Sequence, residues 1–96
     1  MHQENKYNLS IIIPVYNEEN YLELLFKDLE KYFNYDDVEV IVVDDGSYDN
    51  SNNILEKLKN NSYNFKYQLI ILNRNFGKGF AVREGAKNST GKYLLL

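Results

Sequence analysis

Four short apolar runs divide the chain at similar intervals: LSIIIPV (9–15), VEVIVV (38–43), QLIIL (68–72) and KYLLL (92–96). In the second and third runs, three or four apolar residues follow one another and β-branched residues are frequent. Runs of this kind are typical of strands that are buried on both faces, as in a parallel sheet covered by helices. The pattern therefore predicts four buried strands.

Helical spacing fills the intervals between these runs. Between the first two runs, apolar residues at intervals of three and four mark one helix face: Leu22, Leu25, Phe26, Leu29 and Phe33. Asn17 is predicted to cap this helix, because its side-chain oxygen can accept a free backbone N–H group. Glu18 and Glu19 would place negative charge at the positive end of the helix dipole.

Two further helices follow from the same reasoning. Apolar residues over 54–58 mark a short helix, which Asp49 or Ser51 would cap. The third helix covers 77–87, and its small residues would let it pack closely on a sheet. The alternation predicts an α/β fold in the order β-α-β-α-β-α-β, a Rossmann-like three-layer sandwich with a mainly parallel sheet.

Length and composition limit the range of functions. A chain of 96 residues forms at most one small domain, which we assign to residues 9–96. Residues 1–8, which include the single histidine, His2, are expected to be disordered or irregular. Eleven basic residues against fourteen acidic ones give a net charge of −3, which argues against a nucleic-acid partner.

Other classes of protein are excluded on similar grounds. The chain has no cysteine, so disulfides and thiolate metal sites are impossible. No apolar run approaches the ~20 residues that span a bilayer, and the polar start lacks the apolar core of a signal peptide. We therefore expect a cytoplasmic protein.

Polar and glycine-containing segments follow three of the predicted strands: PVYNE (14–18), DDGS (44–47) and NRNFGKG (73–79). In an open parallel sheet, ligands bind outside the carboxyl ends of the strands. If the predicted topology holds, these segments converge on one rim although they are far apart in sequence. The sequence therefore predicts a ligand site there.

Each segment offers groups that suit a nucleotide. The ring of Tyr16 could lie against a base or ribose, and Glu18 could accept hydrogen bonds from ribose hydroxyls. Asp45 accepts hydrogen bonds only, which suits the imide N–H of uracil or the N–H edge of guanine. Lys78 and Arg83 can neutralise a diphosphate.

Backbone features support the same interpretation. Pro14 fixes φ at the end of the first strand and removes a donor. Gly46 permits a turn that a side chain would hinder. The helix that starts near Gly77 offers free N–H groups to an anion.

Each motif also has a purely structural interpretation. Pro14 and Asn17 could be only a strand exit and a cap, DDGS is a common turn composition, and Lys78 and Arg83 could be solvated charges. The chain lacks GxxxxGK[ST] and GxGxxG, which speaks against a P-loop and against a dinucleotide-binding motif. What favours a site is the presence of all three segments at matching strand ends.

Three stretches carry a family resemblance: LSIIIPVYNEENYL, VEVIVVDDGSYDNS and NRNFGKGFAVREGAKNSTGKYLLL. Together they resemble the nucleotide-binding half of family-2 glycosyltransferases with the GT-A fold, over residues 9–96. GKGFAVREG is most similar to the branch that transfers glucose or mannose to polyprenyl or dolichyl phosphate.

The resemblance implies a nucleotide-sugar donor, UDP- or GDP-hexose, and an inverting transfer to an acceptor such as a polyprenyl phosphate. It implies the following cofactor-binding residues: Pro14, Tyr16, Glu18, Val43, Asp45, Arg74 and Lys78. Asp44 is expected to have a supporting, structural role. The resemblance assigns no catalytic residue within these 96 positions.

The resemblance also implies Mg²⁺ or Mn²⁺ on an Asp-x-Asp motif directly after the fourth strand. The sequence ends at Leu96, where that motif would begin, so we expect a truncated domain that binds no metal alone and has no transferase activity. The parent protein would work at the cytosolic face of a membrane, through its missing parts or its lipid acceptor.

Two other functions stay open from the sequence. One is a non-catalytic nucleotide-binding or interaction module with the same fold. The other is a nucleotidyltransferase, although such enzymes carry a glycine-rich, basic loop after the first strand and PVYNE is neither. The apolar fourth strand would expose an edge, and we therefore expect a homo-oligomer.

Overall fold

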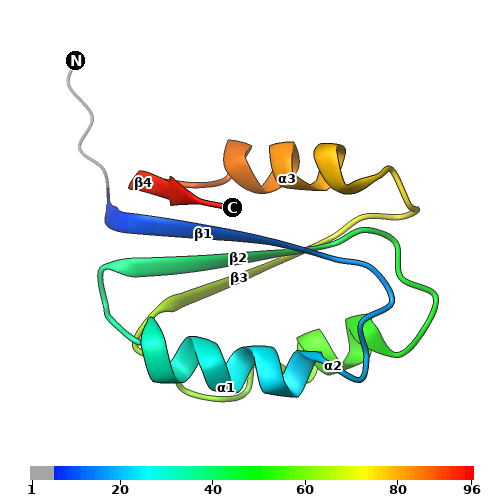
Figure 1. The fold of residues 1–96 in the computed structure, drawn as a ribbon, viewed down its shortest axis with the longest axis horizontal. Coiled ribbons are helices and arrows are strands. Elements are labelled where there is room, and N and C mark those ends of the chain that lie inside the picture. The colour runs from blue at the N-terminus through cyan, green and yellow to red at the C-terminus, as the bar shows by residue number, and fades with distance from the viewer. Residues whose placement is uncertain (1–5) are drawn as a thin grey trace.

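The computed structural model describes residues 6–96, in which strands and helices alternate without exception. The elements are β1 (Tyr7–Val15), α1 (Leu22–Tyr32), β2 (Val38–Asp44), α2 (Ser51–Leu58), β3 (Lys66–Ile71), α3 (Lys78–Lys87) and β4 (Gly91–Leu95). The strands pair in the order β3-β2-β1-β4, and every pair is parallel. Helices α1 and α2 cover one face and α3 the other (Figure 1). The predicted α/β three-layer sandwich is thus confirmed.

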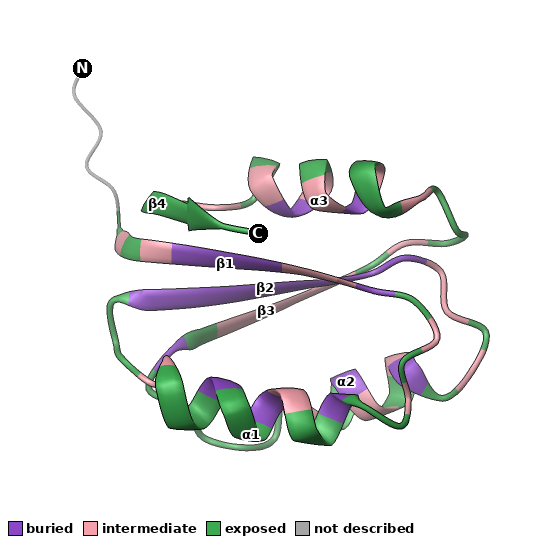
Figure 2. Ribbon diagram, in the orientation of Figure 1, coloured by how far each residue is buried: buried purple, intermediate pink, exposed green. Residues whose placement is uncertain are grey.

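Strand β2 lies between β1 and β3, and every one of its residues is buried (Figure 2). Because successive side chains of a strand point to opposite faces, β2 supplies two separate cores. Val38, Val40 and Val42 pack with the inner face of α1 and with Leu55 of α2. Ile41 and Val43 pack with Ile12 and with Ala81 of α3. A strand buried on both faces favours a near-continuous apolar run, and β2 has one from Val40 to Val43.

Strand β1 begins earlier than the sequence suggested. Tyr7 and Asn8 were expected to belong to an irregular start, but they are part of β1 because Tyr7 pairs with Gly91 of β4. A polar side chain is tolerated at this end because the first residues of β1 are only partly buried. His2, by contrast, lies outside the described residues.

The segment 60–67 would be taken for a polar loop from its sequence, but its second half belongs to the sheet and the core. Lys66 and Tyr67 belong to β3, and the aromatic residues before them are core residues. Tyr63 stacks on Phe65 with ring centroids 4.6 Å apart, and Tyr67 lies edge-on to Phe26 of α1 at 5.0 Å. The hydroxyl of Tyr67 donates to the Leu55 carbonyl at 2.9 Å, and burial raises its pKa, so it stays a donor. These aromatic rings complete the core between the sheet and helices α1 and α2.

A buried glutamate, Glu39 of β2, links β2 to β1 and to the start of β4. Oε1 of Glu39 accepts hydrogen bonds from the Ser10 hydroxyl and the Thr90 N–H, both at 2.6 Å. The Ser10 Oγ in turn accepts the Gly91 N–H at 2.8 Å. A Cβ at Gly91 would overlap that hydroxyl, so only glycine lets β4 approach β1 this closely.

The packing of α3 depends on a second glycine. A Cβ at Gly85 would overlap Cγ2 of Ile12 and lie 3.2 Å from Cγ2 of Val43. The predicted close packing of this helix on the sheet is therefore confirmed, and it has no room for a methyl group.

We predict that Gly85→Ala destabilises the fold by ~1–3 kcal/mol, because overpacking outweighs the gain of up to ~1 kcal/mol in helix propensity. Urea denaturation of both proteins measures the difference. Gly79→Ala is the matched control in the same helix, since its Cβ would meet only the Arg83 guanidinium at 3.6 Å. That variant should be neutral or slightly more stable, and equal effects of the two changes would contradict the packing argument.

Strand β4 leaves an apolar edge on the described part of the chain. Tyr93, Leu94 and Leu95 are all exposed, and on its β4 side β1 has no strand partner beyond the pair Ile11–Leu95 within residues 6–96. Unpaired edges and apolar patches favour association. The expected homo-oligomer therefore stays a prediction for this surface.

Sedimentation velocity at about 50 µM should show a dimer or a larger species. Leu95→Lys should shift it towards monomer, because charge on an edge strand opposes pairing. Leu24→Lys changes an equally exposed residue on the outer face of α1 and should have no effect. A monomer before any substitution would overturn the prediction.

Candidate functional site

Three loops gather at the carboxyl ends of β1, β2 and β3, on the right of Figure 1. They are the β1–α1 loop (16–21), the β2–α2 loop (45–50) and the β3–α3 loop (72–77). Parallel strands require this arrangement, because each strand delivers its following loop to the same edge. The convergence predicted from the sequence is thus present in the structure.

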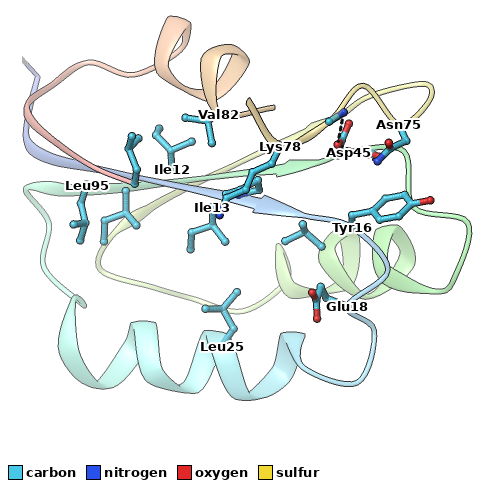
Figure 3. Close-up of a pocket in the computed structure, with 15 residues that line it drawn as sticks. Ile12, Ile13, Tyr16, Glu18, Leu25, Asp45, Asn75, Lys78, Val82 and Leu95 are labelled. Atoms are coloured by element: carbon cyan, nitrogen blue, oxygen red, sulfur yellow. Dashed lines mark hydrogen bonds between the residues drawn. The ribbon is translucent and has the colours of Figure 1, made fainter. Parts of the chain in front are cut away.

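A cavity of about 1050 Å³ opens beside these loops, along the free edge of β1 (Figure 3). Five of the seven predicted binding residues line it: Pro14, Tyr16, Glu18, Asp45 and Lys78. Its volume is at the upper end of the range for small-molecule sites. Both faces of β1 contribute, since Ile12 and Val82 of α3 lie on one side and Ile13 and Leu25 of α1 on the other.

The other two predicted residues do not line this cavity. Val43 is fully buried in the core beneath α3, because its alternation in β2 directs it into the sandwich. Arg74 is exposed, and its guanidinium lies 4.5 Å from the centre of the Phe76 ring, in a cation–π contact. Asn75, which the sequence analysis did not single out, lines the cavity, and so does Gly77, which it named as the start of the third helix.

Asp45 connects the second loop to the third. Its Oδ1 accepts the Phe76 N–H at 2.8 Å, and its Oδ2 accepts the Gly77 N–H at 3.0 Å and the Asn75 amide at 3.1 Å. A carboxylate has about four acceptor positions, so one position on Oδ1 stays free. The buried charge is therefore compensated by backbone and amide dipoles instead of by a basic side chain.

Gly46 makes this contact between loops possible. Its φ of +71° is left-handed, and a Cβ would overlap the backbone of Arg74. The predicted turn at Gly46 is confirmed. The preceding acid, Asp44, is fully buried and accepts the Ser47 N–H at 3.2 Å through Oδ1. Its Oδ2 has no partner within residues 6–96.

Asn17 does not cap α1, contrary to the prediction. The residue at the N-cap of α1 is Tyr21, which makes no side-chain cap bond. The side chain of Asn17 points instead to the second loop, where Oδ1 accepts the N–H groups of Tyr48 at 3.0 Å and Asp49 at 3.4 Å. Its own N–H donates to the Ser47 hydroxyl at 2.8 Å.

The next two residues continue this contact. The Glu18 N–H donates to the Ser51 hydroxyl at 2.9 Å, and the Glu19 N–H donates to Oδ2 of Asp49 at 3.3 Å. Oε2 of Glu19 accepts the Asn50 N–H at 3.1 Å in return. The acidic pair predicted to serve the α1 dipole thus lies before the helix, whose first turn contains Glu23 instead, and it bonds to the second loop and the start of α2.

Asp49 also serves α2, in which Asn50 is the N-cap without a side-chain bond. The capping hydrogen bond comes from Asp49, one residue before the N-cap position, whose Oδ1 accepts the Ser51 N–H at 2.8 Å. Asp49 was one of the two predicted caps, and Ser51, the other, is the first residue of the helix. Desolvation is the largest influence on the pKa of Asp49 and raises it, but hydrogen bonds from Ser51 and Glu19 together lower it below its usual value. Ionised Asp49 therefore stabilises the fold at pH values above its pKa in the unfolded chain. This contribution is lost as the pH falls through its lower pKa in the folded protein.

The ring of Tyr16, at the mouth of the cavity, is in contact with a second aromatic ring. Tyr16 is 42% exposed, and its ring lies edge-on to Tyr48 with centroids 6.2 Å apart. Such a contact fixes the ring plane and leaves surface for a planar ligand. Tyr48 is a second residue that the sequence analysis did not single out.

The described residues do not form a metal site. No group of three or more His, Asp or Glu residues that could hold an ion occurs within residues 6–96. Of the two acids that line the cavity, Asp45 already accepts three hydrogen bonds. The metal that the resemblance implies thus finds no ligand set here.

Comparisons with known proteins agree with this geometry. The profile described as "Glycosyl transferase family 2" matches residues 10–96. The chain belongs to glycosyl transferase family 2. This membership sets aside the nucleotidyltransferase considered from the sequence.

Relatives within family 2 include transferases that are named for lipid phosphates. The chain is 40% identical to a mouse dolichyl-phosphate beta-glucosyltransferase over 95 residues, covering 92% of this chain and 29% of that protein. It is 39% identical to the undecaprenyl-phosphate 4-deoxy-4-formamido-L-arabinose transferase of Proteus mirabilis (strain HI4320) over 94 residues, covering 91% and 27%. The chain therefore spans less than a third of the length of these relatives.

A solved structure has the same fold. The crystal structure of S. aureus TarS 1-349 superimposes with a TM-score of 0.78 at 32% sequence identity, over 93% of this chain and 26% of that one. Among residues 6–96, no helix is both long enough and apolar enough to cross a membrane.

The contacts of Asp45 lead to a stability prediction. Asp45→Asn would turn an NH₂ group towards the Gly77 N–H and the Asn75 amide, or towards the Phe76 N–H, whichever way the amide is oriented. Leaving buried donors unpaired costs ~1–3 kcal/mol. Urea denaturation should therefore show a loss of this size.

Asp28→Asn provides the control, because Asp28 is exposed on α1 and the change removes the same charge. It should alter the free energy of unfolding by less than ~0.5 kcal/mol. Equal stability of the two variants would show that the three hydrogen bonds to Asp45 contribute nothing.

Proposed function

We propose that residues 9–96 are the nucleotide-sugar-binding part of an inverting glycosyltransferase that moves a hexose from a UDP- or GDP-sugar to a polyprenyl phosphate. One observation carries the proposal: Tyr16, Glu18, Asp45 and Lys78 come from three separate loop regions and line one cavity. The rim of this cavity carries one aromatic ring and three charged side chains, and its floor is apolar. Such a lining suits a nucleotide, which has a flat base, hydroxyl groups and an anionic end.

Each side chain has a role that its place supports. The exposed face of Tyr16 stacks on the base or ribose, and Glu18 accepts hydrogen bonds from the ribose hydroxyls. Lys78 is the first residue of α3 and meets the diphosphate. The first N–H groups of α3 have no carbonyl partner inside the helix, and they bind the same anion.

The hydrogen bonds of Asp45 bear on the choice of base. Only one acceptor position is free on its carboxylate. The imide edge of uracil offers a single N–H, whereas the N–H edge of guanine offers two adjacent donors. A carboxylate with one free position therefore favours UDP over GDP.

Residues outside this chain complete the proposal. The acceptor class is inferred from the lipid phosphates in the names of the relatives. Such an acceptor would keep the full protein at a membrane surface, on the cytosolic side. Any Mg²⁺ or Mn²⁺ would need ligands beyond those described here, as would the acceptor site and the catalytic base.

Isothermal titration of the chain with UDP and with GDP tests the proposal. UDP should bind, and GDP should bind about tenfold more weakly or not at all, since the loss of one hydrogen bond and a clash of donors costs ~1–3 kcal/mol. Tyr16→Ala should weaken UDP binding by about 5- to 150-fold, because stacking on an aromatic ring is worth ~1–3 kcal/mol per base.

Lys78→Ala should weaken the binding of UDP more than that of uridine, because the lysine meets only the phosphates. Lys87→Ala is the matched control at the far end of α3, where Lys87 pairs with Glu84 at 3.2 Å, and it should change neither. If the unsubstituted chain binds neither nucleotide, the proposal fails and a non-catalytic interaction module takes its place.

A further inference from the structure

The first and second loops form a single unit through the contacts of one residue. Asn17 joins them with three hydrogen bonds, in which its N–H donates to Ser47 and its Oδ1 accepts from Tyr48 and Asp49. We call these bonds the Asn17 clasp. The residues on either side, Tyr16 and Glu18, both line the cavity, whereas Asn17 itself does not.

The backbone at Asn17 is also unusual. Its φ of +53° is the only left-handed value outside glycine within residues 6–96. Most side chains clash in this conformation, and asparagine tolerates it because its short polar group bonds locally. Strained backbone of this kind persists only when the surrounding contacts hold it, and it clusters at ligand sites. Here the clasp supplies those contacts.

The clasp is separate from the core and from the start of α1. The side chain of Asn17 makes no hydrogen bond to α1, and it belongs to neither apolar cluster. Its loss therefore removes no packing from the sandwich. What it changes is the path of the chain between Tyr16 and Glu18.

We propose that Asn17 is a positioning residue for the nucleotide site, acting through Tyr16 and Glu18. The inference rests on the proposed function, because it concerns how the same cavity holds its ligand. A fixed path through Asn17 directs one neighbour's ring and the other's carboxylate at the ligand before it binds. Preorganisation of this kind increases affinity by reducing the ordering that binding must impose.

The site makes two separate demands on this position. One is an acceptor at the distance of Oδ1, and the other is tolerance of a positive φ. Asparagine and aspartate meet both, glycine meets only the backbone demand, and alanine meets neither. Three substitutions at Asn17 therefore separate the clasp from the backbone conformation.

The experiment measures UDP affinity of the chain and its Asn17 variants by isothermal titration, together with amide chemical shifts. Asn17→Asp should retain affinity within about threefold, and Asn17→Gly should weaken it by about five- to twentyfold, as expected for two lost hydrogen bonds. Asn17→Ala should weaken it further. The amide signals of Tyr48 and Asp49 should move in the glycine and alanine variants and stay near their places in the aspartate variant.

A double substitution tests the route of action. In a Tyr16→Ala/Glu18→Ala background, Asn17→Gly should cause little further loss of the remaining affinity, because the groups that it positions are gone. Asn53→Ala is the control for loss of an asparagine, since Asn53 bonds only to Asn50 on the exposed side of α2. It should leave UDP binding unchanged.

Two results would overturn the inference while leaving the proposed function intact. One is full UDP affinity in Asn17→Gly although the Tyr48 and Asp49 signals have moved. The other is an equal loss with and without Tyr16 and Glu18, which would mean that Asn17 acts elsewhere. If the unsubstituted chain binds no UDP, the proposed function fails first and the inference falls with it.

Discussion

Backbone N–H groups at the carboxyl edge of the sheet are the constraint on which this structure depends. A parallel sheet brings three loops to this edge, and beyond the first residue of the second and third loops, whose N–H groups still bond to β1 and β2, the N–H groups need other acceptors. Side chains of a neighbouring loop accept them: Asn17 and Asp49 between the first and second loops, and Asp45 between the second and third. The rim of the cavity is therefore built from mutual hydrogen bonds, and no loop holds its shape alone.

This arrangement accounts for adjacent acids without a basic partner in sequence. Asp44 and Asp45 point to opposite faces of the sheet, one towards Ser47 and the other towards the third loop. Their charges are therefore separated by the strand, and each meets N–H dipoles. Under the proposed function, the free position that this leaves on Asp45 would be the basis for selecting among bases.

The fold could be predicted from the sequence because burial on both faces leaves a near-continuous apolar run, as in β2 from Val40 to Val43. The convergence of the loops followed from parallel topology alone. The role of Asn17 could not be predicted, because its partners lie 31 and 32 residues further along the chain and local patterns favour a cap. Val43 and Arg74 matched the family's motifs, but alternation buries the first and a cation–π contact holds the second away from the cavity. That the lining residues bind a nucleotide stays a prediction.

Pro14 has a consequence for how this sheet can grow. The carbonyl of Val15 accepts the Asp45 N–H on the β2 side, so by alternation Pro14 faces the opposite side, along the free edge of β1. A strand added there would find a ring where it needs a hydrogen-bond donor. Lateral extension of the sheet is thus interrupted beside the cavity, so a strand that paired with β4 could not continue across the cavity entrance.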